Sequence, residues 1–242
     1  ALKYHKHVFV EKPMALNEDE LSEIIKAYRA SRKHSNLRFM VGFNRRFSPS
    51  VRQAKEFFAD AAEPMMVNYR VNAGFLPKDH WTHDPVEGGG RIIGEVCHFI
   101  DTIQYLSNGE PASVFAQSLS LAGARTQSDN VALTIRFSNG SVGVITYLAN
   151  GDSAVPKERI EIFSGGKTAV VDNFKRLETY HGGSRKVYET LAIEKGHKVE
   201  VEKFINSIHL ANDLIPFESL VATTRATFRI IESLESGLPV EL

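Results

Sequence analysis

The sequence predicts an α+β fold: a large, mostly antiparallel open sheet with helices on one face, preceded by a remnant of a parallel α/β domain. Three observations support this prediction. The chain up to about residue 60 alternates short apolar segments with helical patterns, as parallel α/β units do. Beyond that point most apolar residues alternate with polar ones, which is typical of strands with one buried face. Two helical patterns then close the chain.

The first part of the chain is predicted as strand, helix, strand, helix. Residues 7–10 form a short apolar strand, and Asn17 caps the helix that follows. Glu20 lies three residues after Asn17, which completes the pattern of a capping box. Residues 38–41 form the second strand, and Ser48-Pro49 gives the next helix an N-cap and a proline at its first position.

The second part is predicted to be rich in strands. A polar, aromatic loop at 75–87 and a helix from about residue 91 to 106 follow its first strand. The turn at 138–140 joins two alternating segments into a hairpin. The expected strands are 65–73, 114–121, 131–137, 142–148, 159–163, 168–171, 177–180 and 186–191, and the closing helices carry apolar stripes over 201–208 and 220–234.

Composition narrows the function classes. Lys+Arg and Asp+Glu both number 29, so no basic excess indicates nucleic acid or an anionic membrane as a partner. The single cysteine, Cys97, allows no intramolecular disulfide, and the cytoplasm fits that usage. No apolar run approaches the roughly 18 residues of a membrane helix. Residues 1–6 resemble the last turn of a helix that runs into a strand, so we expect a piece of a longer protein.

A lysine directly follows the first predicted strand. In open α/β sheets, ligands gather at the carboxyl ends of the strands, and Lys12 lies at such an end. It precedes Pro13, whose ring restricts the backbone, and the bond between them could be cis. This position makes Lys12 a candidate for proton transfer beside a cofactor. The alternative is a solvated lysine with no role, which is common at strand ends.

The second candidate is His98, on the helix predicted from about residue 91. Glu95 and Asp101 lie three residues to either side, on roughly the same face. Two carboxylates near one imidazole would favour its charged form and fix its orientation. A histidine so placed can exchange a proton with a substrate hydroxyl. The competing interpretation is a histidine satisfied by a neighbouring carbonyl.

Glycines mark the start of the same helix. Gly94 lies one turn before His98, and glycine inside a helix costs about 1 kcal/mol relative to alanine. It is tolerated where something must approach the backbone closely. The run at 88–90 either shapes the helix N-terminus for an anion or sugar oxygen, or is a flexible entry into the helix.

The loop before the glycine run contains possible ligand contacts. Trp81 offers a stacking face for a sugar ring, and His80, His83 and Asp84 offer polar contacts. Zinc needs three or four converging ligands, and this spacing matches no known pattern, although a zinc hydrolase using His80, His83 and His98 is a further alternative. Cys97 sits among apolar neighbours, where thiols are commonly inert. Arg45 and Arg46 either bind an anion or decorate a loop, and we expect Arg46 to face the pocket.

Together these residues resemble the glucose-fructose oxidoreductase / inositol dehydrogenase / MocA (Gfo/Idh/MocA) family of NAD(P)-dependent oxidoreductases. Residues 10–13 are similar to the family's Glu-Lys-Pro motif, and residues 42–49 to its next characteristic loop. Residues 88–101 resemble its glycine-run and histidine helix, and residues 237–240 resemble its C-terminal ending. The four motifs occur in order at suitable separations over essentially the whole chain, which makes the resemblance specific.

The resemblance implies roles for these residues. Lys12 would lie near the nicotinamide and the reacting hydroxyl, and His98 would be the general acid/base. The hydride would pass to or from NAD or NADP, since no side chain here can accept it. The large sheet would hold the substrate and form the interface of a homo-oligomer. The implied cofactor contacts are Glu11, Lys12, Pro13 and Arg46, and the implied substrate contacts are Trp81, His83, Arg91, Gly94, Glu95 and Asp101, with no metal.

The chain departs from the family in two ways. Residues 1–45 would be the C-terminal remnant of the dinucleotide-binding domain, whose first strand would lie roughly 80–100 residues earlier, and residues 46–242 the substrate-binding and oligomerisation domain. The family usually has an aspartate one turn before the histidine, where this chain has Gly94. Glu95 or Arg91 could substitute, but each points about 100° or more away on the helix. The variant also resembles a subgroup fused behind a zinc-type alcohol dehydrogenase module.

We therefore expect the substrate-binding and catalytic portion of an NAD(P)-dependent oxidoreductase that acts on a CH–OH group of a sugar or polyol. The alternative is a non-catalytic binding or oligomerisation module derived from such an enzyme. Gly94 in place of the acid favours the module, and the presence of Lys12 and His98 favours the enzyme. The sequence does not choose between NAD and NADP.

Overall fold

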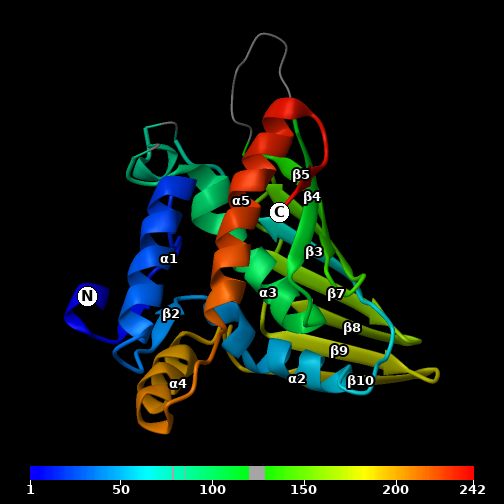
Figure 1. Ribbon diagram of the computed structural model, residues 1–242. Coiled ribbons are helices and arrows are strands. Elements are labelled where there is room, and N and C mark those ends of the chain that lie inside the picture. The colour runs from blue at the N-terminus through cyan, green and yellow to red at the C-terminus, as the bar shows by residue number, and fades with distance from the viewer. Residues whose placement is uncertain (78, 85, 120–128) are drawn as a thin grey trace.

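The computed structural model describes residues 1–77, 79–84, 86–119 and 129–242 (Figure 1). The helices are α1 (Glu18–Arg32), α2 (Pro49–Phe57), α3 (Cys97–Ser107), α4 (His197–Leu210) and α5 (Phe217–Ser236), with a π-helical turn η4 (Ile92–Val96) and short 3₁₀ turns η1 (Leu2–Tyr4), η2 (Asn44–Phe47) and η3 (Trp81–His83). The strands are β1 (Val8–Val10), β2 (Phe39–Val41), β3 (Met66–Asn72), β4 (Pro111–Ser118), β5 (Val131–Phe137), β6 (Val142–Leu148), β7 (Glu158–Ser164), β8 (Lys167–Asp172), β9 (Arg176–His181), β10 (Ser184–Glu189) and β11 (Val240–Glu241).

Two sheets confirm the predicted α+β class. β1 and β2 pair in parallel, while a nine-stranded sheet runs in the order β10-β9-β8-β7-β3-β6-β5-β4-β11. Every pairing in the larger sheet is antiparallel except that of β3 with β6. Helices α2, α3 and α5 cover one face of this sheet, as Figure 1 shows, and α1 and α4 lie beside the parallel pair.

The first helix begins where its sequence indicates. Asn17 caps α1, and its side chain accepts a hydrogen bond from the Glu20 amide at 2.9 Å. The return bond of the predicted capping box differs by one residue, because the Glu20 carboxylate accepts from the Leu16 amide at 2.8 Å. Pro49 stands at the first position of α2 as expected, although the Ser48 side chain makes no capping bond there.

The alternation of apolar residues places the sheet correctly. In β5 every second residue is buried and those between are exposed, because one face packs against the helices. The hairpin β5–β6 forms at the predicted turn, and the expected strands β7 and β8 also pair antiparallel. The last predicted strand, 186–191, is shifted, since β10 spans 184–189 and all of its side chains are exposed. Of the strand predicted at 114–121, residues 120 and 121 lie outside the described residues, as do 78 and 85 of the predicted loop.

Two hydrophobic clusters hold the molecule together. One lies between the large sheet and helices α2, α3 and α5. The other combines β1, β2 and α1 with α4 and the start of α5. Cys97 belongs to the second cluster, although it begins the helix that packs on the sheet. The start of α3 therefore lies where the two clusters meet, and the predicted domain boundary near residue 45 stays a prediction.

The helix predicted from about residue 91 to 106 is present but does not begin as an α-helix. Residues Ile92–Val96 form a π-helical turn, and the α-helix proper starts at Cys97. Gly89 and Gly90 precede the turn with φ angles of 67° and 80°, which favour glycine. π-Helical turns are rare and occur frequently at functional sites.

Candidate functional site

The structure brings the two predicted catalytic residues to one place. Lys12 lies two residues after the end of β1, and its bond to Pro13 is cis, as the sequence allowed. Its ammonium Nζ donates a hydrogen bond to the main-chain carbonyl of Gly94 at 2.9 Å. Gly94 lies in the π-helical turn, one turn before His98. The close approach to the backbone that Gly94 predicted is made by the Gly88 carbonyl oxygen, which would lie 3.2 Å from a Cβ at Gly94.

His98 is a buried, neutral imidazole. Its side chain is 8% exposed, and Phe43 packs edge-on against the ring with the centroids 5.9 Å apart. Within the described part of the chain, its Nδ1 is buried without a hydrogen-bond partner. Burial lowers the pKa of His98 well below its usual range, and the positive charges of Arg45 and Lys12 lower it further, followed by those of His197 and Lys195. The imidazole is therefore unprotonated at neutral pH, and one of its ring nitrogens carries no proton.

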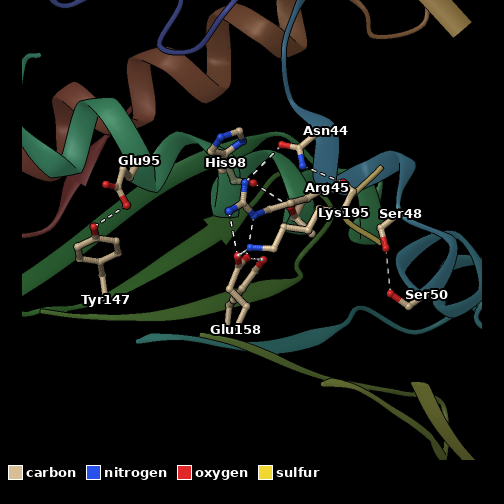
Figure 2. A network of polar contacts seen from close by, with 11 residues as sticks. Asn44, Arg45, Ser48, Ser50, Glu95, His98, Tyr147, Glu158 and Lys195 are labelled. Carbon is tan, nitrogen blue, oxygen red and sulfur yellow. Dashed lines mark hydrogen bonds and ion pairs between the residues drawn. The ribbon is translucent and has the colours of Figure 1, made fainter. Parts of the chain in front are cut away.

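The prediction that Glu95 and Asp101 favour the charged form of His98 is wrong. Asp101 instead accepts two hydrogen bonds from Arg46, at 2.9 and 2.5 Å, in a buried ion pair. The carboxylate of Glu95 accepts a hydrogen bond from the Tyr147 hydroxyl at 2.7 Å, and Figure 2 shows it directed at that ring. The spacing places both residues around His98 in sequence, but packing gives each carboxylate another partner.

The arginine beside His98 is Arg45 rather than Arg46. Its Nε and Nη2 donate to the Glu158 carboxylate at 2.7 and 3.0 Å, as Figure 2 shows. Glu158 also accepts from the Tyr69 hydroxyl and from Lys195 Nζ, each at 2.7 Å. Burial alone would raise the pKa of Glu158, but Arg45 and then Lys195 outweigh it and lower the pKa to about 2. A cofactor contact by Arg46 stays a prediction.

A buried carboxyl on α4 escaped the sequence analysis. Glu200 is 4% exposed, and its Oε2 has no hydrogen-bond partner among the described residues. Burial raises its pKa to about 7, and the charges of Glu11 and Asp101 add to the rise. The one sequence signal is Gly196, which begins α4: a Cβ there would lie 2.5 Å from the Asn44 carbonyl oxygen, so the helix packs tightly on η2.

The predicted substrate loop is anchored by ionic contacts. Trp81 is 62% exposed on η3, and His83 Nε2 lies 3.0 Å from the Asp129 carboxylate. Arg91 is buried and donates to the Gly74 carbonyl at 2.8 Å, with its guanidinium 3.7 Å from Asp129. Substrate contacts by Trp81, His83, Arg91, Gly94, Glu95 and Asp101 stay predictions, as does a cofactor contact by Glu11.

Two further expectations concern metal and thiol chemistry. Over the described ranges, no group of three or more His, Cys, Asp or Glu residues could hold a metal ion, and His80 Nδ1 contacts Thr82 instead. Burial raises the pKa of Cys97 to about 12, so this thiol is the inert one that its apolar neighbours predicted. None of the helices in the described residues is long and apolar enough to cross a membrane.

Comparison with known proteins gives matches along the chain. Residues 51–169 match the GFO/IDH/MocA C-terminal domain. The myo-inositol 2-dehydrogenase of Thermotoga maritima is 27% identical over 85% of this chain and 63% of its own length. The levoglucosan dehydrogenase of Pseudarthrobacter phenanthrenivorans is 28% identical over 72% of this chain and 50% of its own length. The chain thus spans about half to two thirds of the curated relatives it matches.

The fold is also that of a solved structure. Levoglucosan dehydrogenase in complex with NADH and levoglucosan superposes with a TM-score of 0.82 at 22% identity, over 99% of this chain and 74% of that one. At this identity the likeness shows the fold. In that fold the large sheet with its helical layer and the short parallel pair occur in one molecule, as they do here.

Proposed function

Because this chain belongs to the GFO/IDH/MocA family of oxidoreductases, we propose that it is the substrate-binding and catalytic portion of an NAD(P)-dependent dehydrogenase. Its substrate would carry a CH–OH group on a sugar or polyol, as in the relatives named for myo-inositol and levoglucosan. The observation that carries the proposal is the meeting of Lys12, held on the Gly94 carbonyl, with a buried neutral His98.

The residues at the ends of β1 and β2 fit the nicotinamide end of the cofactor. In doubly wound sheets the dinucleotide lies at the carboxyl ends of parallel strands, and Glu11 and Lys12 follow β1 there. Gly42 follows β2, and a Cβ at that position would lie 3.1 Å from the Glu11 carboxylate, so the two strand ends approach closely. Glu11, Lys12 and Pro13 would hold this end, which supplies the acceptor or donor of the hydride when bound.

His98 would take the proton of the substrate hydroxyl. Its Nδ1 is buried and unpartnered within the described residues, and such an atom costs roughly 1–3 kcal/mol unless a ligand supplies the missing hydrogen bond. Its lowered pKa keeps the imidazole unprotonated at neutral pH, so a ring nitrogen can receive the proton, and it also makes His98 a weaker base than a free histidine. In oxidation the O–H proton goes to His98 as the C–H hydrogen leaves as hydride, and reduction reverses both transfers.

Lys12 would orient the reacting oxygen. An ammonium group carries three donors, of which one is used on Gly94 O. A second can donate to the substrate oxygen and stabilise the negative charge that develops on it as the proton leaves. The roles of the two residues are therefore distinct: Lys12 holds the oxygen and its charge, and His98 exchanges the proton.

The test uses the full-length protein, which is screened with sugars and polyols, including myo-inositol and levoglucosan, against NAD and NADP. We expect Lys12→Met and His98→Asn each to lower kcat by about 10²-fold or more while cofactor affinity, measured by calorimetry, changes little. Lys26→Met is the matched control, because that lysine is exposed on α1 in an ion pair with Glu23.

Two results would contradict the proposal. Unchanged turnover in both variants removes Lys12 and His98 from the chemistry. Cofactor binding without turnover of any CH–OH substrate favours the alternative, a binding or oligomerisation module. A homo-oligomer built through the large sheet, a fusion to an N-terminal dehydrogenase module and a cytoplasmic location also stay proposals, and the mass of the full-length protein in solution tests the first.

A further inference from the structure

The partner of Lys12 is a neutral main-chain group. Nζ lies 2.9 Å from the carbonyl oxygen of Gly94, and no ion pair joins Lys12 to a carboxylate in the described part of the chain. The carbonyl belongs to the π-helical turn Ile92–Val96, which inserts a wider turn between the glycine run and α3. Glu95, which follows Gly94 in the sequence, accepts a hydrogen bond from the Tyr147 hydroxyl instead.

We propose that the π-helical turn is a positioning element for Lys12, in which the Gly94 carbonyl fixes the ammonium and Gly88 locks the turn to the loop that carries Trp81. The inference rests on the proposed function, because it assigns how the catalytic lysine is held. Gly88 and Gly94 are positioning residues in this account, since neither has a side chain that could touch the substrate.

The first lock is the contact between the two glycines. A Cβ at Gly94 would lie 3.2 Å from the Gly88 carbonyl oxygen, which is closer than ordinary van der Waals contact. The chain therefore runs past the turn so closely that a methyl group at position 94 requires one of them to shift by a few tenths of an ångström. Any side chain at Gly94 must displace either the π-helical turn or the backbone at Gly88. When the turn is displaced, the Gly94 carbonyl moves with it.

The second lock joins Gly88 to the loop. A Cβ at Gly88 would lie 2.4 Å from the Thr82 carbonyl oxygen and 2.5 Å from that of Trp81. The amides of Gly88 and Gly89 both donate to the Asp84 carbonyl, at 2.9 and 2.8 Å. The η3 loop, the glycine run and the π-helical turn thus form one continuous packed unit that ends on Lys12.

The neutral acceptor has an electrostatic consequence for His98. The charge of Lys12 is not cancelled by its partner, and it is one of the positive charges that act on the imidazole, with Arg45 from η2 and with His197 and Lys195 from the start of α4. On the helix itself, Asp101 is paired with Arg46 and Glu95 is bonded to Tyr147. A carboxylate introduced at position 94 would offset the Lys12 charge and raise the pKa of His98.

The experiment compares Gly94→Ala and Gly94→Asp in the full-length protein, with a sugar or polyol that it turns over. We expect Gly94→Ala to lower kcat roughly 10-fold with little change in KM, because the lysine is displaced by tenths of an ångström. Alanine is intrinsically the better helix former, so a merely structural glycine would predict unchanged kcat and equal or higher thermal stability. We expect Gly94→Asp to move the acid limb of the pH profile of kcat/KM to higher pH.

Gly88→Ala tests the second lock, and we expect it to lower kcat although it touches neither Lys12 nor substrate. Gly183→Ala is the control for a glycine substitution away from the site, since no atom lies within 4 Å of its Cβ position; its φ is positive, whereas that of Gly88 is not. Should Gly88→Ala fail to fold, Gly94→Ala decides alone. Unchanged kcat in Gly94→Ala together with an unmoved pH profile in Gly94→Asp overturns the inference. Lys12→Met separates the two proposals: if it abolishes turnover while Gly94→Ala does not, only the positioning role is lost.

Discussion

Buried polar groups near Arg45 differ in pairing rather than in burial: Glu158 belongs to a paired cluster with Arg45, whereas His98 and Glu200 are unpaired. Glu158 is 1% exposed and accepts hydrogen bonds from Arg45, Tyr69 and Lys195. Glu200 and His98 are 4% and 8% exposed, yet each has a buried atom with no partner in the described residues. The pKa values of the two glutamates accordingly move in opposite directions from the same ordinary value, to about 2 for Glu158 and about 7 for Glu200.

The difference separates buried groups that link elements of the fold from buried groups that leave a polar atom unpaired. A buried polar atom is tolerated when it is hydrogen-bonded and destabilises the fold when it is not. Glu158 joins β7 to η2 through Arg45 and to the start of α4 through Lys195, so it ties together three elements distant in sequence. His98 Nδ1 and Glu200 Oε2 make no comparable link between elements within the described residues.

The largest effect is expected from breaking the paired cluster. Glu158→Gln leaves the buried Arg45 and the partly exposed Lys195 without a counter-charge, so we expect it to lower the free energy of unfolding by about 3–5 kcal/mol. Denaturant unfolding at pH 7 measures this, with Glu161→Gln as the control on the same strand. Glu161 forms a part-exposed pair with Arg159, and its loss should cost at most about 1 kcal/mol.

The same cluster fixes a pH dependence. The folded pKa of Glu158, about 2, lies below its ordinary value of 4.5. Its stabilising contribution of roughly 3 kcal/mol is therefore fully present above pH 4.5 and is lost as the pH falls through 2. Equal losses in Glu158→Gln and Glu161→Gln would show that the paired cluster does not stabilise the fold more than an exposed pair does.

The unpaired carboxyl of Glu200 predicts a pH dependence of stability with the opposite sign. The folded pKa of Glu200, about 7, lies above 4.5, so the native state binds more protons than the unfolded state between these values and stability falls as the pH rises. Glu200→Gln should therefore match the wild type near pH 4 and exceed its free energy of unfolding by up to roughly 3 kcal/mol at pH 8. Glu202→Gln, an exposed position on the same helix, is the control. A variant less stable than the wild type at pH 8 would mean that the Glu200 carboxylate has a partner in the folded protein.

The sequence was sufficient for the fold because the fold depends on local patterns. The period-two alternation of β5 and the cap at Asn17 are visible within a few residues. Lys12 and His98 are candidates for the same reason, since each belongs to a short motif, and their catalytic roles stay predictions. The pairing of Arg45 with Glu158 spans 113 residues, and no local pattern indicates it.

Two features of the site escaped for physical reasons. Spacing of three residues shows which helical face a side chain shares, but not which partner reaches it first, so Glu95 and Asp101 were assigned to His98 when Tyr147 and Arg46 bind them. The π-helical turn has the same apolar pattern as an α-helix over Ile92–Val96. Its position is decided by tertiary contacts at Gly94 and Gly88, which the sequence signals only as glycines.

The smallest effect is expected at Glu95, whose carboxylate is hydrogen-bonded but partly exposed to solvent. Its side chain is 22% exposed, and it accepts the Tyr147 hydroxyl at 2.7 Å. Tyr147→Phe keeps the buried ring under the Arg91 guanidinium and removes only this hydrogen bond. Water can replace the lost donor, so we expect a loss of about 1 kcal/mol in denaturant unfolding. A loss of 3 kcal/mol or more would place Glu95 with the structural pairs, and its predicted contact with substrate would then be dropped. A loss near 1 kcal/mol leaves its carboxylate able to exchange the tyrosine for a substrate hydroxyl.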